Sequence, residues 1–438
     1  MPYLKTKEIY QNHAFVSVPI RIRLLPLIIM LSWLLFTVFL FVYGPYEYDL
    51  SNKAQLYTYL TVVHIMLCLG YFVGMITRGQ SCKLLLNGPK MAKTCLYISF
   101  FIFVASMVYT KGGDIGRLKL AMEDPAAAYI SSSTREVANI FNYISIFTAP
   151  IATYSLILCV FYWPLLQNKP KLIYIIFLIV SILGSIGSST RAGIISVLLV
   201  IFPTVAVLYY GKLVVFNLKK KVIILTMIVI ILCSFFYYTS HLVEKRGGAT
   251  NMLMNPITLQ MPDQDNFIYK IIPEGIHNLF SVSTWYITHG YARLASAMEL
   301  PFIGIGFGIG NSYFLIRNAE RLTGIDDLGD LSYGLRIDEA TTGSFGLYWS
   351  TIYTWIASDF TFVGSVFIIY IIGYLFAISW IDSIVWYNPL AVAAFGILTV
   401  LIYSFPLNNP LQDGSGVAIY FVIISCWLFT RHRKVRVK

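Results

Sequence analysis

The sequence predicts an all-α polytopic integral membrane protein, with about ten (10–12) transmembrane helices and one large outer loop of short interfacial helices. The first observation is composition, since 57% of the residues are hydrophobic and only 12% are charged. The second is a series of apolar runs, each close to the roughly 20 residues that a helix needs to cross the hydrocarbon core. The third is a hydrophilic stretch, 241–350, that interrupts the series.

The apolar runs divide the chain into its predicted spans. The first run follows about twenty residues, lacks a small-residue cleavage site and is followed by further spans, so it is predicted to be a transmembrane helix and not a cleaved signal peptide. The ten predicted spans are 24–43, 57–76, 94–109, 140–163, 172–187, 192–210, 222–240, 355–380, 389–406 and 416–430.

Basic residues in the short loops predict the orientation. Lys and Arg concentrate in cytoplasmic loops, and with ten spans the basic loops fall on the same side as both termini. Only Glu8 and Asp382 are acidic there, and the loop near Asp382 has no positive residue, which leaves room for a re-entrant segment or an extra span. The basic residues on this side are Lys5, Lys7, Arg21, Arg23, Arg78, Lys83, Lys90, Lys93, Lys169, Lys171, Lys212, Lys219, Lys220, Lys221 and the tail 431–438.

The charge asymmetry and the cysteines exclude several classes of function. The net charge of +11 is explained by the basic loops, so no nucleic-acid partner is needed. The six cysteines lie in predicted spans or basic loops and none lies in the outer loop. A disulfide framework or a cysteine-based metal site is therefore not expected.

Two outer segments are too large to be plain connectors. In 110–139, Ser133 and Glu136 stand at the spacing of a capping box and predict a helix start. In 241–350, the apolar pieces 276–287 and 300–309 are too short or too interrupted to span and predict interfacial helices. The chain 1–438 is thus one transmembrane domain, with 241–350 forming a cap inserted before the last three spans.

Acidic residues gather near the end of the outer loop, and two interpretations stay open. Residues 326–339 carry four aspartates, Glu339 and an arginine, Arg336. One interpretation is a solvated acidic loop, and the other is a divalent-ion site or an acidic catalytic cluster. The aspartates do not follow the spacing of a calcium-binding loop, which favours the solvated loop.

The most suggestive short motif is the run from Gly187 to Gly193 around Arg191. It joins two apolar runs with almost no loop, which predicts Arg191 at the outer membrane boundary beside a helix N-terminus. An arginine, the hydroxyls of Ser189 and Thr190, and free backbone N–H groups form a receptor for phosphate or pyrophosphate. The alternative is an arginine that reaches the interface and binds ordinary lipid headgroups.

A second candidate pair lies in the run from Trp285 to Leu294. His289 and Arg293 are four residues apart and share a face if this segment is helical. Histidine titrates near neutral pH, so His289 is a candidate base for a sugar hydroxyl. The alternative is a structural histidine among aromatic residues.

These segments resemble the Wzy-type polymerases that lengthen O-antigen and related bacterial polysaccharides. The resemblance rests on the Thr190-Arg191-Ala192 turn, the long outer loop before the last three spans, the stretch from Tyr286 to Gly306, and the approach from Thr342 to Phe360. It implies a metal-independent glycosyltransferase in the bacterial inner membrane, with both termini cytoplasmic and the active face periplasmic. The substrate would be glycan carried on undecaprenyl pyrophosphate.

The resemblance also implies roles for particular residues. Arg191 and Arg293, with Ser189 and Thr190, would hold the pyrophosphate, and His289 or secondly Glu339 would act as the base. The activated donor carries the energy, so no cofactor is expected. The implied partners are the lipid-linked glycans, membrane lipids, and the chain-length regulator and flippase of the same pathway.

Two alternatives remain open. A ligase that moves finished glycan onto lipid A–core differs from a polymerase only in its acceptor. A flippase or transporter of lipid-linked sugars needs charged residues along a path inside the membrane. The predicted spans hold almost none, with His64 and the boundary residue Asp359 as near exceptions.

Overall fold

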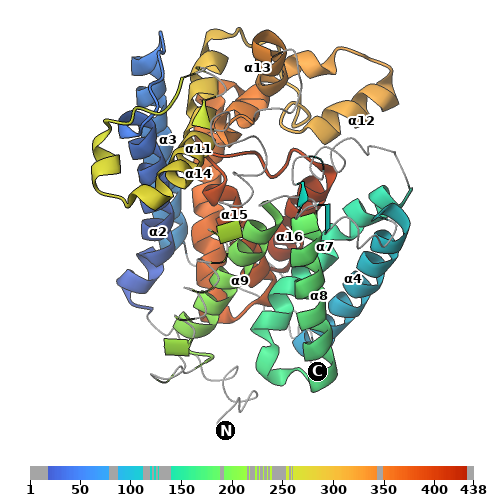
Figure 1. Ribbon diagram of the computed structural model, residues 1–438. Helices are drawn as coiled ribbons and strands as arrows, with labels where there is room; N and C mark the ends of the chain where they lie inside the picture. The colour runs from blue at the N-terminus through green and yellow to red at the C-terminus, as the bar shows by residue number, and fades with distance from the viewer. Residues whose placement is uncertain are drawn as a thin grey trace.

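The protein is a helical bundle in which every regular element of the described residues is a helix (Figure 1). The computed structural model describes residues 18–77, 87–111, 140–187, 192–214, 260–342 and 349–431, with isolated positions between 119 and 127 and between 217 and 258. The prediction of an all-α fold is confirmed for this part of the chain.

Seven of the described helices are long and apolar enough to cross a membrane. Of the other predicted spans, 94–109 lies within α4 (Gly88–Lys111), 389–406 largely within the shorter α15 (Pro389–Tyr403), and 222–240 falls mostly outside the described residues. The total of ten therefore stays a prediction. The seven helices are α2 (Ile20–Tyr43), α3 (Lys53–Ile76), α7 (Ile140–Phe161), α8 (Asn168–Gly187), α9 (Ala192–Tyr210), α14 (Ile352–Trp386) and α16 (Gly414–Arg431).

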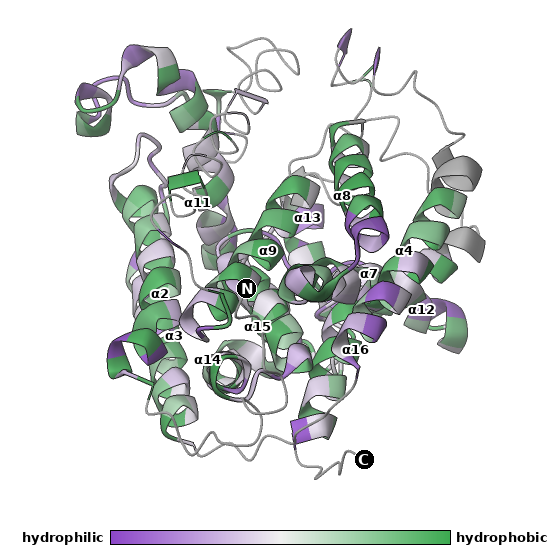
Figure 2. Cartoon of the chain, turned by 90° about the horizontal axis from the view of Figure 1, so that it is seen from below, coloured by the Kyte–Doolittle hydropathy of each residue, from purple (hydrophilic) through white to green (hydrophobic). Residues whose placement is uncertain are grey.

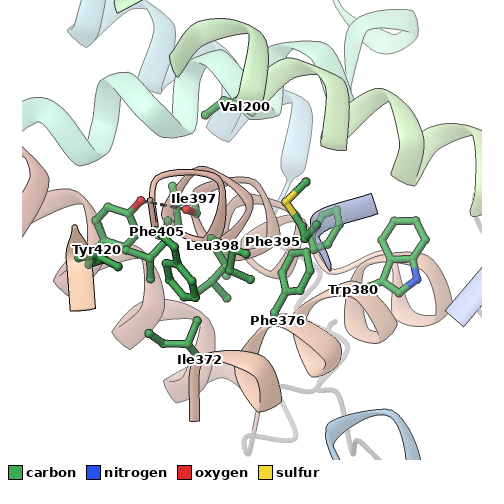
Figure 3. Close-up of a cluster of buried hydrophobic side chains, with 14 of the residues drawn as sticks. Val200, Ile372, Phe376, Trp380, Phe395, Ile397, Leu398, Phe405 and Tyr420 are labelled. Carbon is green, nitrogen blue, oxygen red and sulfur yellow. Dashed lines mark hydrogen bonds between the residues drawn. The ribbon is translucent and has the colours of Figure 1, made fainter. Parts of the chain in front are cut away.

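The helix α15 lies at the centre of the bundle. Nearly all of its side chains are buried, against α14, α16 and α9 (Figure 3). Phe395 stacks on Phe376 of α14, with ring centroids 5.1 Å apart. From α16, the Tyr420 hydroxyl donates to the carbonyl oxygen of Ile397 at 2.9 Å. A helix enclosed on all sides is expected to be apolar around its whole circumference, and α15 is.

The helices α3 and α14 approach through glycines. A Cβ atom on Gly70 would lie 1.9 Å from the carbonyl oxygen of Tyr370, and one on Gly74 would lie 2.6 Å from that of Tyr374. On the facing helix, a Cβ atom on Gly373 would lie 2.3 Å from the carbonyl oxygen of Leu67. Small residues four apart allow such backbone contact between membrane helices, where dispersion and not the hydrophobic effect drives association.

Hydrogen bonds between helix termini show which termini lie together at each end of the bundle. The Tyr71 hydroxyl donates to the Arg23 carbonyl, and the Tyr387 hydroxyl donates to the Gly211 carbonyl. The Trp380 indole N–H of α14 also donates to the Ile22 carbonyl of α2 at 3.0 Å. These contacts gather the start of α2 with the ends of α3, α9 and α14, which we call the basic end. The opposite end, where Asn52 donates to the Ala295 carbonyl, is the cap end. Among the basic residues of the predicted cytoplasmic loops, Arg21, Arg23 and Lys212 thus lie at the basic end.

The position of Asp382 differs from the sequence prediction. Instead of lying in a loop, Asp382 belongs to α14, and its side chain is fully buried at the basic end. Its Oδ2 accepts from Arg431 Nε at 2.9 Å and from Trp427 Nε1 at 3.2 Å, both on α16. Arg431 of α16 therefore supplies the positive charge that the loop after α14 lacks. No extra span is needed to explain that loop. Only Tyr387 and Asn388 separate α14 from α15.

The cap is built from segment 260–342 and contains α11 (His277–Glu299), α12 (Tyr313–Thr323) and α13 (Tyr333–Thr342). It covers the end opposite to the start of α2 and the end of α16 (Figure 1). In Figure 2, hydrophobic colouring prevails along α2 and α8, whereas α11 and α12 carry many hydrophilic residues. Helices are thus confirmed for 277–287. The predicted helix over 300–309 is wrong, because glycine at every second position from 304 to 310 disfavours helix and the segment is a loop.

The buried pair between Asp382 and Arg431 generates a stability prediction. In Asp382→Ala, Arg431 keeps its charge without its carboxylate partner, so we expect unfolding to become easier by about 3–5 kcal/mol. The double variant Asp382→Ala, Arg431→Leu should regain part of that loss. Thermal unfolding of the purified protein in detergent measures both. An Asp382→Ala protein as stable as the wild type would contradict the pairing.

Candidate functional site

The cap brings two of the candidate residues into the interior of the protein. His289 and Arg293 lie on the buried part of α11. Gly290, between them, lies against Thr351 and Pro406. A Cβ atom on Gly290 would lie 2.7 Å from the Pro406 carbonyl oxygen. This contact packs α11 against the starts of α14 and the loop before α16.

His289 is enclosed by aromatic rings. Its side chain is 0% exposed, its ring centroid lies 4.4 Å from that of Trp349, and its Nδ1 is 2.9 Å from the Trp285 carbonyl oxygen. Burial, assisted by the nearby positive charge of Arg293, lowers the pKa of His289 to about 4. At neutral pH the imidazole is therefore uncharged, a weak base, and out of contact with solvent.

Arg293 forms a buried ion pair. Its guanidinium pairs with the carboxylate of Asp338 on α13, and its Nε donates to the Ser350 hydroxyl at 3.1 Å. Only 2% of Arg293 is exposed. The positive charge is thus compensated within the protein, and the pair fastens α11 to α13. For Arg293 to hold a pyrophosphate, the ligand would have to displace Asp338.

Glu339 follows Asp338 on α13 but has different surroundings. Its side chain is exposed, whereas that of Asp338 is buried against Arg293. The structure therefore does not bring Glu339 into the aromatic enclosure of His289. The two candidate bases are alternatives and not partners. The aspartates of the same acidic run that precede α13, at 326, 327 and 330, are also exposed.

Arg191, Ser189 and Thr190 lie outside the described residues. The helices that flank them are described, since α8 ends at Gly187 and α9 begins at Ala192. The other end of α9 leads to Gly211, which contacts Tyr387 at the basic end. The ends of α8 and α9 that flank the motif therefore lie toward the cap end.

Arg336 of α13 is a candidate that the sequence did not distinguish from its acidic neighbours. Its guanidinium lies over the Tyr333 ring, 4.8 Å from the centroid, and its Nη1 donates to the Pro301 carbonyl at 3.0 Å. Its Nε and Nη2 are buried and have no hydrogen-bond partner within the described residues. No carboxylate among those residues pairs with it. These two N–H groups would bind an anion in place of water if the groups that cover them moved aside.

Asp359 anchors the glycine-rich loop beneath Arg336. Its side chain is fully buried, and its Oδ1 accepts from the backbone N–H of Gly310 at 3.1 Å. The backbone N–H groups of Gly308 and Asn311 also bond its carboxylate. A Cβ atom on Gly306 would lie 2.5 Å from the same Oδ1, so the glycines allow the loop to enclose the carboxylate.

Two residues after Asp359, α14 is broken. Thr361 has φ 62° and ψ 168°, a region that β-branched residues rarely adopt. Its hydroxyl accepts from the backbone N–H of Gly364 at 3.2 Å, which caps the helix that continues after the break. The strained turn thus separates a short buried helix under the cap from the part of α14 that leads to the basic end.

No group of three or more metal-ligating His, Cys, Asp or Glu residues occurs within the described part of the chain. Comparisons of the chain with protein-family models, with curated proteins and with solved structures found no match. The resemblance described from the sequence therefore rests on the quoted motifs alone.

The buried His289 generates a pH prediction. Its pKa is about 4 in the folded protein, against an ordinary value of about 6.5, so the unfolded chain binds a proton first as the pH falls. The folded state should thus lose stability between about pH 6.5 and 4, by roughly 3 kcal/mol from this residue. The variant His289→Phe should lose correspondingly less between pH 7 and 4.5 in thermal unfolding. Equal losses in the two proteins would refute the assignment.

The loop around Asp359 generates a second prediction. Gly306→Ala places a methyl group against the Asp359 carboxylate and should destabilise the protein by about 1–3 kcal/mol. Gly304→Ala is the matched control, because its Cβ would make only an ordinary 3.5 Å contact with Leu331. Thermal unfolding and hydrogen exchange of residues 304–311 compare them. Identical behaviour of the two variants would show that the loop does not enclose Asp359.

Proposed function

We propose that this chain is a periplasmic-face glycosyltransferase of the bacterial inner membrane. It would polymerise oligosaccharide repeat units linked to undecaprenyl pyrophosphate into O-antigen or a similar surface polysaccharide. The observation that carries the proposal is Arg336, whose two buried N–H groups lack an acceptor at the cap end of a helical bundle with seven candidate spans.

The proposed reaction needs positive charge at the leaving group. When a sugar hydroxyl attacks the anomeric carbon, the bond to pyrophosphate breaks and negative charge develops on the departing oxygen. The planar guanidinium of Arg336 carries Nε and Nη2 side by side, and a phosphate would bind both in a bidentate manner once the groups that cover them moved aside. Arg191, with Ser189 and Thr190, would add a second cation and two hydroxyls from the residues that precede α9.

The attacking hydroxyl benefits from a base, and the geometry favours Glu339 over His289. Glu339 is exposed and lies three residues after Arg336, so the two share a face of α13. His289 is enclosed and has a pKa of about 4, which makes it a weak base. We therefore assign the proton transfer to Glu339 and a structural role to His289 and to Arg293, which is engaged by Asp338.

A substrate with a long lipid must reach the site from the side. Arg336 contacts the loop at Pro301, and the same loop is held by Asp359 at the start of α14. A pyrophosphate at the lipid headgroup level could meet α13 while its hydrocarbon chain stays in the bilayer. This placement suits a polymerase and needs no charged path through the membrane.

The experiment is deletion of the gene and inspection of the surface polysaccharide on a gel. The proposal expects loss of the ladder, with a single repeat unit retained on the lipid A–core. Complete loss of substituted core would instead indicate a ligase or a flippase. A ladder that persists unchanged would refute a role in polymerisation.

Substitutions test the assignment of Arg336. In the complemented deletion strain, Arg336→Ala should reduce chain extension by about 10²-fold, because a donor to developing negative charge is removed. Arg336→Lys should restore only part, since an ammonium group cannot bind in a bidentate manner. Arg321→Ala is the matched control, because Arg321 is an exposed arginine of α12 that donates to the Tyr143 hydroxyl at 3.5 Å. With expression verified, a normal ladder in Arg336→Ala would remove Arg336 from the mechanism.

A further inference from the structure

The glycine-rich loop between α11 and α12 exposes large apolar side chains. Phe307 is 90% exposed, and Ile305 and Ile303 are 59% and 54% exposed. The sequence has no charged residue from Leu300 to Ile316. Exposed apolar side chains that lie together mark a surface that contacts another protein or a membrane.

The most exposed of these residues, Phe307, has a strained backbone. Its φ is 52°, in the left-handed region that a bulky residue rarely adopts. Gly306 and Gly308 stand on either side of it, and glycine adopts this region without strain. Transfer of the Phe307 ring from water to hydrocarbon would offset the strain.

Asp359 fixes the level at which this loop lies along the bundle. The Gly310 backbone N–H donates to its Oδ1 at 3.1 Å. Tyr353 and Phe362, which precede and follow Asp359 in the chain, both contact Tyr59 of α3, with ring centroids 6.0 Å and 5.6 Å apart. The loop is therefore attached close to the level of Tyr59.

That level lies inside the end of α3. Tyr59 is six residues after Lys53, where α3 begins at the cap end, which is about 9 Å along the helix axis. The 24 residues of α3 measure about 36 Å, so roughly 3 Å at each end extends beyond a hydrocarbon core of about 30 Å. The attachment is thus about 6 Å inside the core, within the roughly 5–10 Å at which interfacial anchors insert.

The backbone beside the attachment is bonded within the protein. The Ile309 N–H donates to the Gly306 carbonyl at 2.9 Å, and the Ser312 N–H donates to the Ile309 carbonyl at 3.1 Å. The side-chain amide of Asn409 donates to the Asn311 carbonyl at 2.7 Å. Irregular backbone is tolerated at membrane depth only where the protein satisfies its polar groups, and these contacts meet that condition.

An exposed apolar face of α14 begins next to the attachment. Phe360 follows Asp359 and is 44% exposed, and Val363, Phe367 and Ile371 are 73%, 59% and 47% exposed at intervals of four residues. Because α14 is one of the seven candidate spans, this face is expected to contact acyl chains. The exposed side chains of the loop extend this face toward the cap.

From this arrangement we propose that the glycine-rich loop inserts into the leaflet at the cap end. The Phe307 ring lies among the acyl chains of membrane lipids, and Asp359 holds the loop at that depth through its backbone. The loop is then an anchor that fixes the cap against the bilayer. This role is independent of the function proposed above.

The test uses a single fluorine probe in the full-length protein, in vesicles of phosphatidylethanolamine and phosphatidylglycerol. 4-Trifluoromethylphenylalanine replaces Phe307, which keeps an aromatic side chain on the strained backbone. Molecular oxygen concentrates in the bilayer and a nickel chelate stays in water, and each accelerates the relaxation of fluorine nuclei that it reaches. Fluorine NMR measures the ratio of the two effects.

Two reference positions calibrate this ratio. The same probe at Phe367 reports the exposed apolar face of α14, and the probe at Asp327 reports the exposed acidic run in water. The proposal expects the ratio of the oxygen effect to the nickel effect at 307 to be close to that at 367 and well above that at 327. Ile305 carries the probe in a second protein and should give the same result.

Two results would overturn the proposal. A ratio at 307 and 305 nearer to that at 327 would place the loop in water, above the lipid. Relaxation that neither oxygen nor the nickel chelate accelerates would show that protein covers the loop, either from this chain or from a partner.

Discussion

The structure depends on the rule that a charge removed from water must be compensated nearby. Three buried charges obey it in different ways. Arg293 pairs with Asp338, Asp382 pairs with Arg431, and the carboxylate of Asp359 is bound by backbone N–H groups of a glycine-rich loop. Each contact joins segments far apart in the chain. The first fastens the cap helices to each other, the second joins α14 to α16 at the basic end, and the third ties the cap to the start of α14.

Several polar atoms among the described residues are buried without a hydrogen-bond partner, and the two N–H groups of Arg336 carry the proposed function. Arg336 keeps two buried N–H groups without an acceptor, next to the loop that it contacts at Pro301.

The sequence predicted the helical class and the apolar helices, because these depend on local composition. It could not predict which charges meet. Arg293 and His289 looked like catalytic residues because their spacing placed them on one helical face. Their burial depends on Trp349 and Asp338, which come from distant segments. Asp382 looked like a loop residue because Arg431 is 49 positions away. Likewise, Arg336 stands among acidic residues in the sequence. The sequence did not indicate that its guanidinium pairs with none of them within the described residues.

The central claim is that Arg336 holds the pyrophosphate of the lipid-linked donor. The direct measurement is the affinity of the purified full-length protein, in vesicles, for undecaprenyl pyrophosphate, compared among the wild type, Arg336→Ala and Arg321→Ala. Loss of a charged, bidentate contact should raise the dissociation constant at least about tenfold in Arg336→Ala. Arg321→Ala should bind like the wild type. An unchanged dissociation constant in Arg336→Ala would contradict the account.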